Sequence, residues 1–139
     1  MHILAATLLA LATATATPAH TAKPSDPAVD TCVKAAAVTD HVSVKDVDRD
    51  ACVCATKQLR TRLKGDDFDL HEKMLQIIAT GADKKSFDKQ MSDIMLKRGM
   101  NQPMVDAFLS RSKKAEDQAQ ALCNSQPLLG PLPLKNPLQ

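Results

Sequence analysis

Aromatic side chains are almost missing from this sequence: its 139 residues include three phenylalanines but no tryptophan and no tyrosine. Proteins that bind single-stranded nucleic acid stack the bases on aromatic rings, and sugar-binding sites usually offer an aromatic face as well. The formal net charge is only +2, from 18 basic and 16 acidic side chains, which is too small to favour binding to the phosphate backbone of a nucleic acid. We therefore expect neither nucleic acid nor carbohydrate among the partners.

Glycine is also scarce, and the four glycines form no phosphate-binding loop. No serine stands in the G-x-S-x-G context of a nucleophile elbow. His71 leans toward the apolar side of its helix, where a single histidine is more often packed than catalytic. Because no set of acid, base and nucleophile can be assembled, we expect a protein that is not an enzyme and that needs no cofactor.

Acidic residues alternate in the stretch DVDRDACVCATK, where Asp46, Asp48 and Asp50 resemble the start of a calcium-binding loop. The resemblance ends there, because Ala51 occupies the position that requires glycine and Lys57 the position that requires a bidentate glutamate. An acidic helix start, which the helix macrodipole favours, accounts for these residues without a metal.

Charge is absent from the start of the chain, since no lysine, arginine, aspartate or glutamate precedes Lys23. Leucine and alanine dominate this region, which predicts a secretory signal peptide over residues 1–22, cleaved after Ala16, Ala19 or Ala22. Repeated threonines dilute the run, and it barely reaches the roughly 20 apolar residues that a membrane span needs. We therefore expect a secreted or periplasmic protein with no membrane span in its mature chain.

The mature chain carries four cysteines, Cys32, Cys52, Cys54 and Cys123. An even number in a secreted chain predicts two disulfides. On a helical wheel Cys52 and Cys54 lie about 160° apart, on opposite sides of the apolar stripe, at 100° per residue. Two sulfurs that point apart in this way are placed to crosslink different neighbours rather than each other.

The partner of each cysteine follows from a hairpin turn near residues 41 and 42. Folding the chain there brings Cys32 opposite residue 51, so Cys52 is the nearest cysteine and Cys54 the next. The expected pairs are Cys32–Cys52 and Cys54–Cys123, with the exchanged pairing as the alternative. A bond between Cys52 and Cys54 is disfavoured because an i,i+2 disulfide strains a helix.

Helix-capping residues and helix-ending glycines divide the chain into about five helices. Ser25 or Asp26 caps the first, with Pro27 at its first position, and Asn101 caps the last. Ser43 caps the second, which ends at a left-handed Gly65, and Asp66 or Asp67 caps the third. The predicted helices are 27–38, 43–64, 68–80, 84–98 and 102–123. The fold class is therefore all-α, a small bundle of about five helices held by two disulfides over residues 23–124.

Apolar residues predict which helix faces enter the core. On the fourth helix the core face carries Phe87, Met91 and Ile94, with Met95 at its edge. On the fifth helix, one shared face carries the five residues Met104, Phe108, Ala115, Ala119 and Leu122. Methionine fills irregular gaps between helices, so core packing accounts for these methionines.

Residues 125–139 change character, because four prolines exclude a helix while five leucines keep the segment apolar. Such an extended Pro/Leu-rich tail can dock in the groove of a partner, lie along its own bundle, or stay disordered.

The sequence thus favours a small secreted or periplasmic non-enzymatic protein that binds an apolar small molecule or a protein partner. A stress-type holdase belongs to the same class, because acid or heat would loosen the bundle and expose its Met- and Ala-rich helix faces. The alternative is a periplasmic copper-handling protein, in which the thiolates of Cys52 and Cys54 and the thioethers of Met91 and Met95 hold Cu(I).

Overall fold

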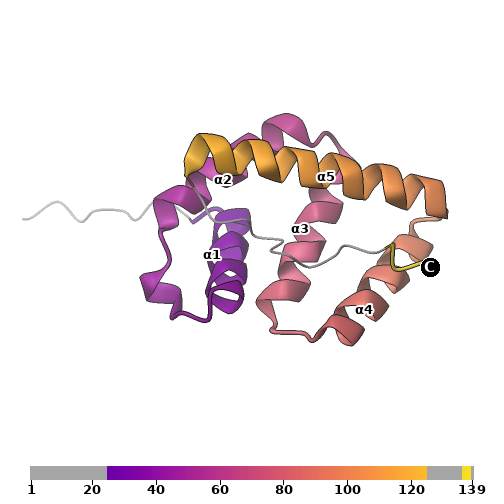
Figure 1. Ribbon diagram of the computed structural model, residues 1–139, viewed down its shortest axis with the longest axis horizontal. Helices are drawn as coiled ribbons and strands as arrows, with labels where there is room; N and C mark the ends of the chain where they lie inside the picture. Colours follow the sequence, from indigo (N-terminus) through magenta and orange to yellow (C-terminus); the bar gives the residue numbers. More distant parts are fainter. Residues whose placement is uncertain (1–24, 125–135, 139) are drawn as a thin grey trace, which may run out of the picture.

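Five α-helices build the computed structural model of this protein, which describes residues 25–124 and 136–138 (Figure 1). The elements are α1 (Pro27–Thr39), the short 3₁₀ helix η1 (Val44–Asp46), α2 (Arg49–Arg62), α3 (Asp66–Ala79), α4 (Lys84–Lys97) and α5 (Gln102–Cys123). The described residues contain no strand, so the all-α prediction is confirmed. The predicted signal peptide, residues 1–22, lies outside the described residues.

Two of the predicted helix starts are confirmed. The carboxylate of Asp26 accepts a hydrogen bond from the Ala28 N–H at 3.0 Å, and Pro27 follows as the first helical residue of α1. At the start of α5 the side-chain oxygen of Asn101 accepts from the Met104 N–H at 3.1 Å. Each cap satisfies an N–H that has no partner within its own helix.

The predicted start of α2 is wrong. Ser43 makes no side-chain cap hydrogen bond, and the chain forms only the three residues of η1 before Val47 returns to extended backbone. Asp48 is the cap instead, because its Oδ1 accepts from the N–H groups of both Asp50 and Ala51. Residues 40–48 therefore form a corner between α1 and α2 rather than a continuation of α2.

The junction between α2 and α3 also differs from the prediction. Helix α2 ends at Arg62 with Leu63 as its C-cap, before Gly65. Gly65 does have a positive φ of 51°, but it is the N-cap of α3, and Asp66 is already the first helical residue. Glycine is suited to this backbone because side chains with a Cβ rarely adopt positive φ.

The main core joins α1, α3, α4 and the first half of α5. Phe87, Met91 and Met95 are buried as expected, and Ile94 packs partly buried against them. The predicted face of α5 is wrong at its ends, where Met104 and Leu122 are exposed. The buried stripe of α5 comprises Val105, Phe108, Leu109, Ser112, Ala115, Glu116 and Ala119. This stripe follows the 3–4 residue spacing of one helix face, and it shares Phe108, Ala115 and Ala119 with the predicted face.

Helices α2 and α5 lie side by side and run antiparallel. The disulfide Cys54–Cys123 joins them with a Cα–Cα distance of 5.7 Å, and the Nε of Arg62 donates to Oε1 of Gln118 at 2.9 Å. From the first contact to the second, the residue number rises along α2, from 54 to 62, and falls along α5, from 123 to 118. The two helices therefore run in opposite directions. A second core of Leu59, Leu63, Ala115 and Ala119 fills this interface, and Figure 1 shows α5 continuing past it toward α4.

Both predicted disulfides are present. Cys32–Cys52 joins α1 to α2 with a Cα–Cα distance of 5.8 Å, and Cys54–Cys123 joins α2 to the end of α5. Neighbouring cysteines of α2 thus crosslink it to different helices, as the wheel predicts. The part of the chain that the structure describes contains no free cysteine.

Three residues of the predicted Pro/Leu tail are described, and they lie on the bundle itself. The Nδ2 of Asn136 donates to the carbonyl of Gln102 at 3.2 Å and to Oδ1 of Asp106 at 2.8 Å. Leu138 packs against the main core. The tail segment 125–135 lies outside the described residues. Within the described residues, no helix is both long and apolar enough to cross a membrane.

Removing either disulfide should cost stability, and the loss should be somewhat larger for the disulfide that closes the longer loop. The sequence separations are 20 residues for Cys32–Cys52 and 69 residues for Cys54–Cys123. Loop-closure entropy gives losses of about 3 kcal/mol for C32S/C52S and about 4 kcal/mol for C54S/C123S. Urea unfolding of the two double variants measures both losses. The unreduced, denatured wild type should show no free thiol by colorimetric titration, and two reactive thiols at Cys52 and Cys54 would contradict the pairing.

Candidate functional site

A pocket opens at the corner where α1, η1 and the start of α2 meet. Its volume is about 230 Å³, and its lining is Cys32, Ala36, Asp40, Val42, Asp46, Val47, Asp48, Ala51, Cys52, Ala55 and Asn124. Small apolar side chains and the Cys32–Cys52 disulfide make the floor. We call this site the corner pocket.

The carboxylates of the corner pocket are held by the local backbone. Asp40 is the C-cap of α1, Asp46 ends η1, and Asp48 caps α2. His41, between α1 and η1, has a φ of 53°, which turns the chain sharply away from α1. None of the three aspartates forms an ion pair with another described residue. The rim is therefore negative, and no basic side chain lines the pocket.

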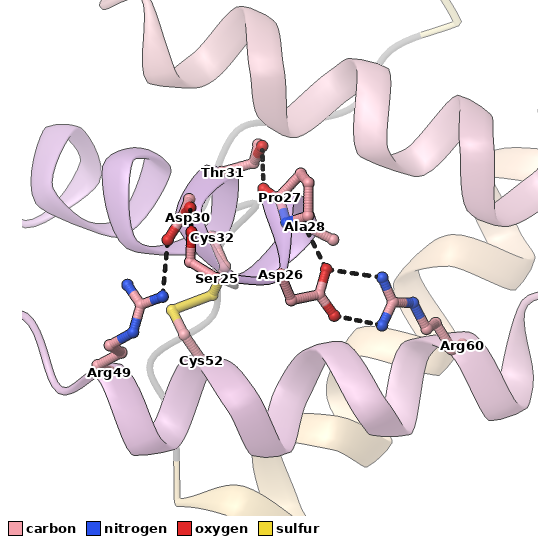
Figure 2. A network of polar contacts seen from close by, with 10 residues as sticks. All are labelled: Ser25, Asp26, Pro27, Ala28, Asp30, Thr31, Cys32, Arg49, Cys52 and Arg60. Carbon is pink, nitrogen blue, oxygen red and sulfur yellow. Dashed lines mark hydrogen bonds and ion pairs between the residues drawn. A yellow bond between two sulfur atoms is a disulfide. The ribbon is translucent and has the colours of Figure 1, made fainter. Parts of the chain in front are cut away.

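Two ion pairs fix α1 against α2 on either side of the Cys32–Cys52 disulfide, as Figure 2 shows. The Nη2 of Arg49 lies 2.7 Å from Oδ1 of Asp30, while both Nη atoms of Arg60 donate to the carboxylate of Asp26. Arg60 lowers the pKa of Asp26, and the Ser25 hydroxyl together with Arg49 lowers that of Asp30. These contacts hold the floor of the corner pocket in one geometry.

A second concave site lies on the other side of the α1–α2 contact. This groove of about 640 Å³ is lined by Asp26, Val29, Arg49, Val53, Thr56, Lys57, Arg60, Thr61 and Lys64. Four of these nine side chains are cationic. Arg49 and Arg60 hold the aspartates of α1, but Lys57 and Lys64 are exposed and form no ion pair with a described residue. We call this site the basic groove.

The two sites divide the charges of one hairpin. Acidic residues gather at the corner before α2 and in its first turn, where Arg49 is the one basic residue. The last turn of α2 carries Arg60 and Arg62, an order that suits the helix macrodipole. Neither site was predicted from the sequence. The signal was nevertheless present, because positions 49, 53, 56, 57, 60, 61 and 64 follow a 3–4 residue spacing and so share one helix face.

His71 lies in the core, as expected for a packed histidine. It is 0 % exposed on α3, and its Nε2 lies 3.3 Å from Oε1 of Glu116 on α5. Ser112, one turn before Glu116, is also fully buried, and its hydroxyl has no hydrogen-bond partner in the described residues. Burial lowers the pKa of His71 to about 4, because the interior disfavours the charged imidazolium. The cluster is closed to solvent, so in this conformation it is placed to affect stability rather than to meet a substrate.

His71 should make the protein less stable in acid. A histidine with a pKa near 6.5 when unfolded and about 4 when folded binds its proton more readily in the unfolded state. Its contribution is complete above pH 6.5 and is lost as the pH falls toward 4, at a cost of up to about 3 kcal/mol. Urea unfolding from pH 7 to pH 4 should show this loss in the wild type.

The variant H71Q, which stays neutral at every pH, should lose less stability than the wild type over the same range. The exposed His41 offers the matched control, since H41N tolerates the positive φ and should leave the wild-type pH dependence unchanged. Equal pH dependence in H71Q and the wild type would show that His71 does not contribute.

The structure separates the residues of the copper hypothesis. Cys52 and Cys54 are each bonded to a different cysteine and carry no thiolate in this oxidised form. Met91 and Met95 are buried in the main core, at 1 % and 0 % exposure. A search of the described residues finds no group of three or more His, Cys, Asp or Glu side chains arranged to hold a metal ion. Copper binding through Cys52 and Cys54 would therefore require both disulfides to be reduced first.

Comparison of the chain with protein-family models, with curated proteins and with solved structures finds no match. The geometry of the chain itself therefore carries the assignment of function.

Proposed function

We propose that this is a non-enzymatic interaction protein whose corner pocket binds a lysine side chain of a protein partner. The observation that carries the proposal is an apolar pocket floor beneath three carboxylates without cationic partners. The proposal places the protein among secreted or periplasmic proteins, since disulfides persist in oxidising compartments.

The floor of the corner pocket favours an aliphatic group. Alanines, valines and a disulfide present no hydrogen-bonding side chain there, so a ligand gains by burying apolar surface, at about 25 cal/mol per Å². Lysine combines a four-carbon aliphatic stem with a charged end, and it buries the stem while the ammonium stays near water. The rim places Asp40, Asp46 and Asp48 where that ammonium would emerge.

The size of the corner pocket favours one side chain over a larger small molecule. Its volume of about 230 Å³ lies below the roughly 300–1,000 Å³ typical of pockets for drug-sized ligands. Exposed apolar side chains are also present at this corner, because Val42 lines the pocket and is 44 % exposed, and Val44 of η1 is 53 % exposed. An exposed apolar patch rimmed by charge is typical of a protein–protein contact.

n-Butylammonium, which reproduces the lysine side chain, tests the pocket directly. Titration of the ¹⁵N-labelled protein should shift amide signals of residues 40–55, while 1-butanol and butyrate at equal concentration should shift them far less. The double variant D40N/D46N should weaken butylammonium binding about fivefold, because two exposed ion pairs of about 0.5 kcal/mol each contribute about 1 kcal/mol.

The matched control D66N/D93N removes the same charge from aspartates that do not line the corner pocket. It should bind butylammonium like the wild type. Equal shifts with butylammonium, butanol and butyrate, or equal weakening in both double variants, would refute a lysine-specific pocket.

A stress-type holdase remains a variant of this proposal, and the buried His71 supports it. Protonation of His71 at low pH would favour loosening of the α3–α5 contact and exposure of Phe108 and its neighbours. Binding of an apolar fluorescent dye should then rise as the pH falls from 6.5 to 4 in the wild type and rise less in H71Q. A flat signal over this range would count against the holdase.

A further inference from the structure

We infer that the partner is a second copy of this chain, whose basic groove supplies a lysine to the corner pocket and receives the valines of the corner in return. This inference rests on the proposed function. It assigns to the corner pocket a ligand that the structure itself displays, on the opposite side of the same hairpin.

The basic groove offers the ligand that the corner pocket requires. Lys57 and Lys64 are the two cations of the groove that hold no described carboxylate, and both are exposed. Arg49 and Arg60, by contrast, are already bound to Asp30 and Asp26. A neighbouring copy would therefore meet two available ammonium groups on aliphatic stems.

The corner in turn offers what the basic groove can receive. Val42, which lines the corner pocket, and Val44 of η1 are both exposed, and both lie between Asp40 and Asp46 in the sequence. The groove includes apolar surface from Val29 and Val53, and Val53 is 49 % exposed. Docking of the corner would cover these valines together and set the rim carboxylates among the cations of the groove. Charge and apolar surface are thus complementary in both directions.

The two surfaces face away from each other, which fixes the kind of assembly. At 100° per residue, Ala55 of the corner pocket and Val53 of the basic groove lie about 160° apart around α2. A surface that meets a different surface on the next copy makes a heterologous contact, which adds copies head to tail. We therefore expect weak, concentration-dependent association into short chains, weakened by salt because the paired charges are exposed.

Other occupants fit the basic groove less well. An anionic membrane would be met by a flat face with several inserting apolar side chains, whereas this site is concave and Val53 is its only exposed large apolar residue. An unrelated acidic peptide has the required charge. However, no feature of the structure specifies which apolar residues such a peptide would carry, whereas the corner of this chain carries exposed valines.

Sedimentation equilibrium of the full-length mature protein and charge-reversed variants tests the inference. The wild type should associate with concentration in low salt. The groove variant K57E/K64E and the pocket variant D40K/D46K should each raise the dissociation constant at least tenfold. A chain that carries all four reversals should associate again, because both surfaces have exchanged sign. The control K85E/K114E changes the net charge by the same amount as K57E/K64E, but at lysines that line neither site, and it should associate like the wild type.

Mixing the two single-surface variants gives the sharpest result. K57E/K64E retains a normal corner pocket with a reversed groove, and D40K/D46K retains a normal basic groove with a reversed pocket. Each surface of one variant therefore meets a surface of opposite charge on the other, so the mixture should associate although neither variant associates alone. Circular dichroism confirms that each variant is folded. K57Q/K64Q replaces K57E/K64E, and D40N/D46N replaces D40K/D46K, if the charge-reversed variant does not fold. A wild type that stays monomeric at millimolar concentration, or no recovery in the fourfold variant, would overturn the inference.

The same samples distinguish a failure of the inferred self-association from a failure of the proposed lysine pocket. A monomeric wild type whose corner pocket still binds butylammonium would leave the lysine pocket standing and exclude only the second copy as its partner. Loss of both results would reject the two proposals together. If a monomeric wild type bound anionic vesicles through Lys57 and Lys64, the basic groove would be assigned to a membrane instead.

Discussion

The opposed directions of Cys52 and Cys54 on α2 are the constraint on which the rest of this structure depends. One sulfur reaches α1 and the other reaches the end of α5, so a single helix is crosslinked to both ends of the described bundle. The first disulfide forms part of the floor of the corner pocket, and the second brings Asn124 to its edge. The disulfides therefore crosslink the ends of three separate helices around the site, and its lining residues Cys32, Ala36 and Cys52 also belong to the main core.

Local chemistry explains how much could be predicted. The caps at Asp26 and Asn101, the turn near residue 41 and the wheel angles of the cysteines act over a few residues each, and together they predicted five helices and both disulfides. The start of α2 failed because Ser43 and Asp48 compete for the same role, and only Asp48 can accept two backbone N–H groups there. The prediction that Met104 is buried is wrong because α5 packs through the adjacent face, which carries Val105 and Leu109.

The corner pocket and the basic groove could not be predicted in the same way. Each combines side chains of α2 with residues of α1 that lie more than ten positions away in sequence, so their depth exists only after the hairpin closes. The charges themselves could be predicted from the sequence, since the basic side chains of the groove share one face of α2. What the sequence does not reveal is that Asp26 and Asp30 neutralise Arg60 and Arg49 and leave Lys57 and Lys64 as the available cations.

Rigidity links this arrangement to binding. The disulfide and the two arginine–aspartate pairs hold α1 against α2 from both sides, as Figure 2 shows, so the corner pocket and the basic groove keep a fixed relation. A surface that is already ordered loses little conformational entropy when it binds, so a weak contact through one side chain and a few charges becomes sufficient. The same crosslinks leave the α3–α5 contact, which contains His71, without a covalent bond of its own. We therefore expect acid to loosen first the contact of α3, which carries no disulfide, with α5, which Cys54–Cys123 still joins to α2.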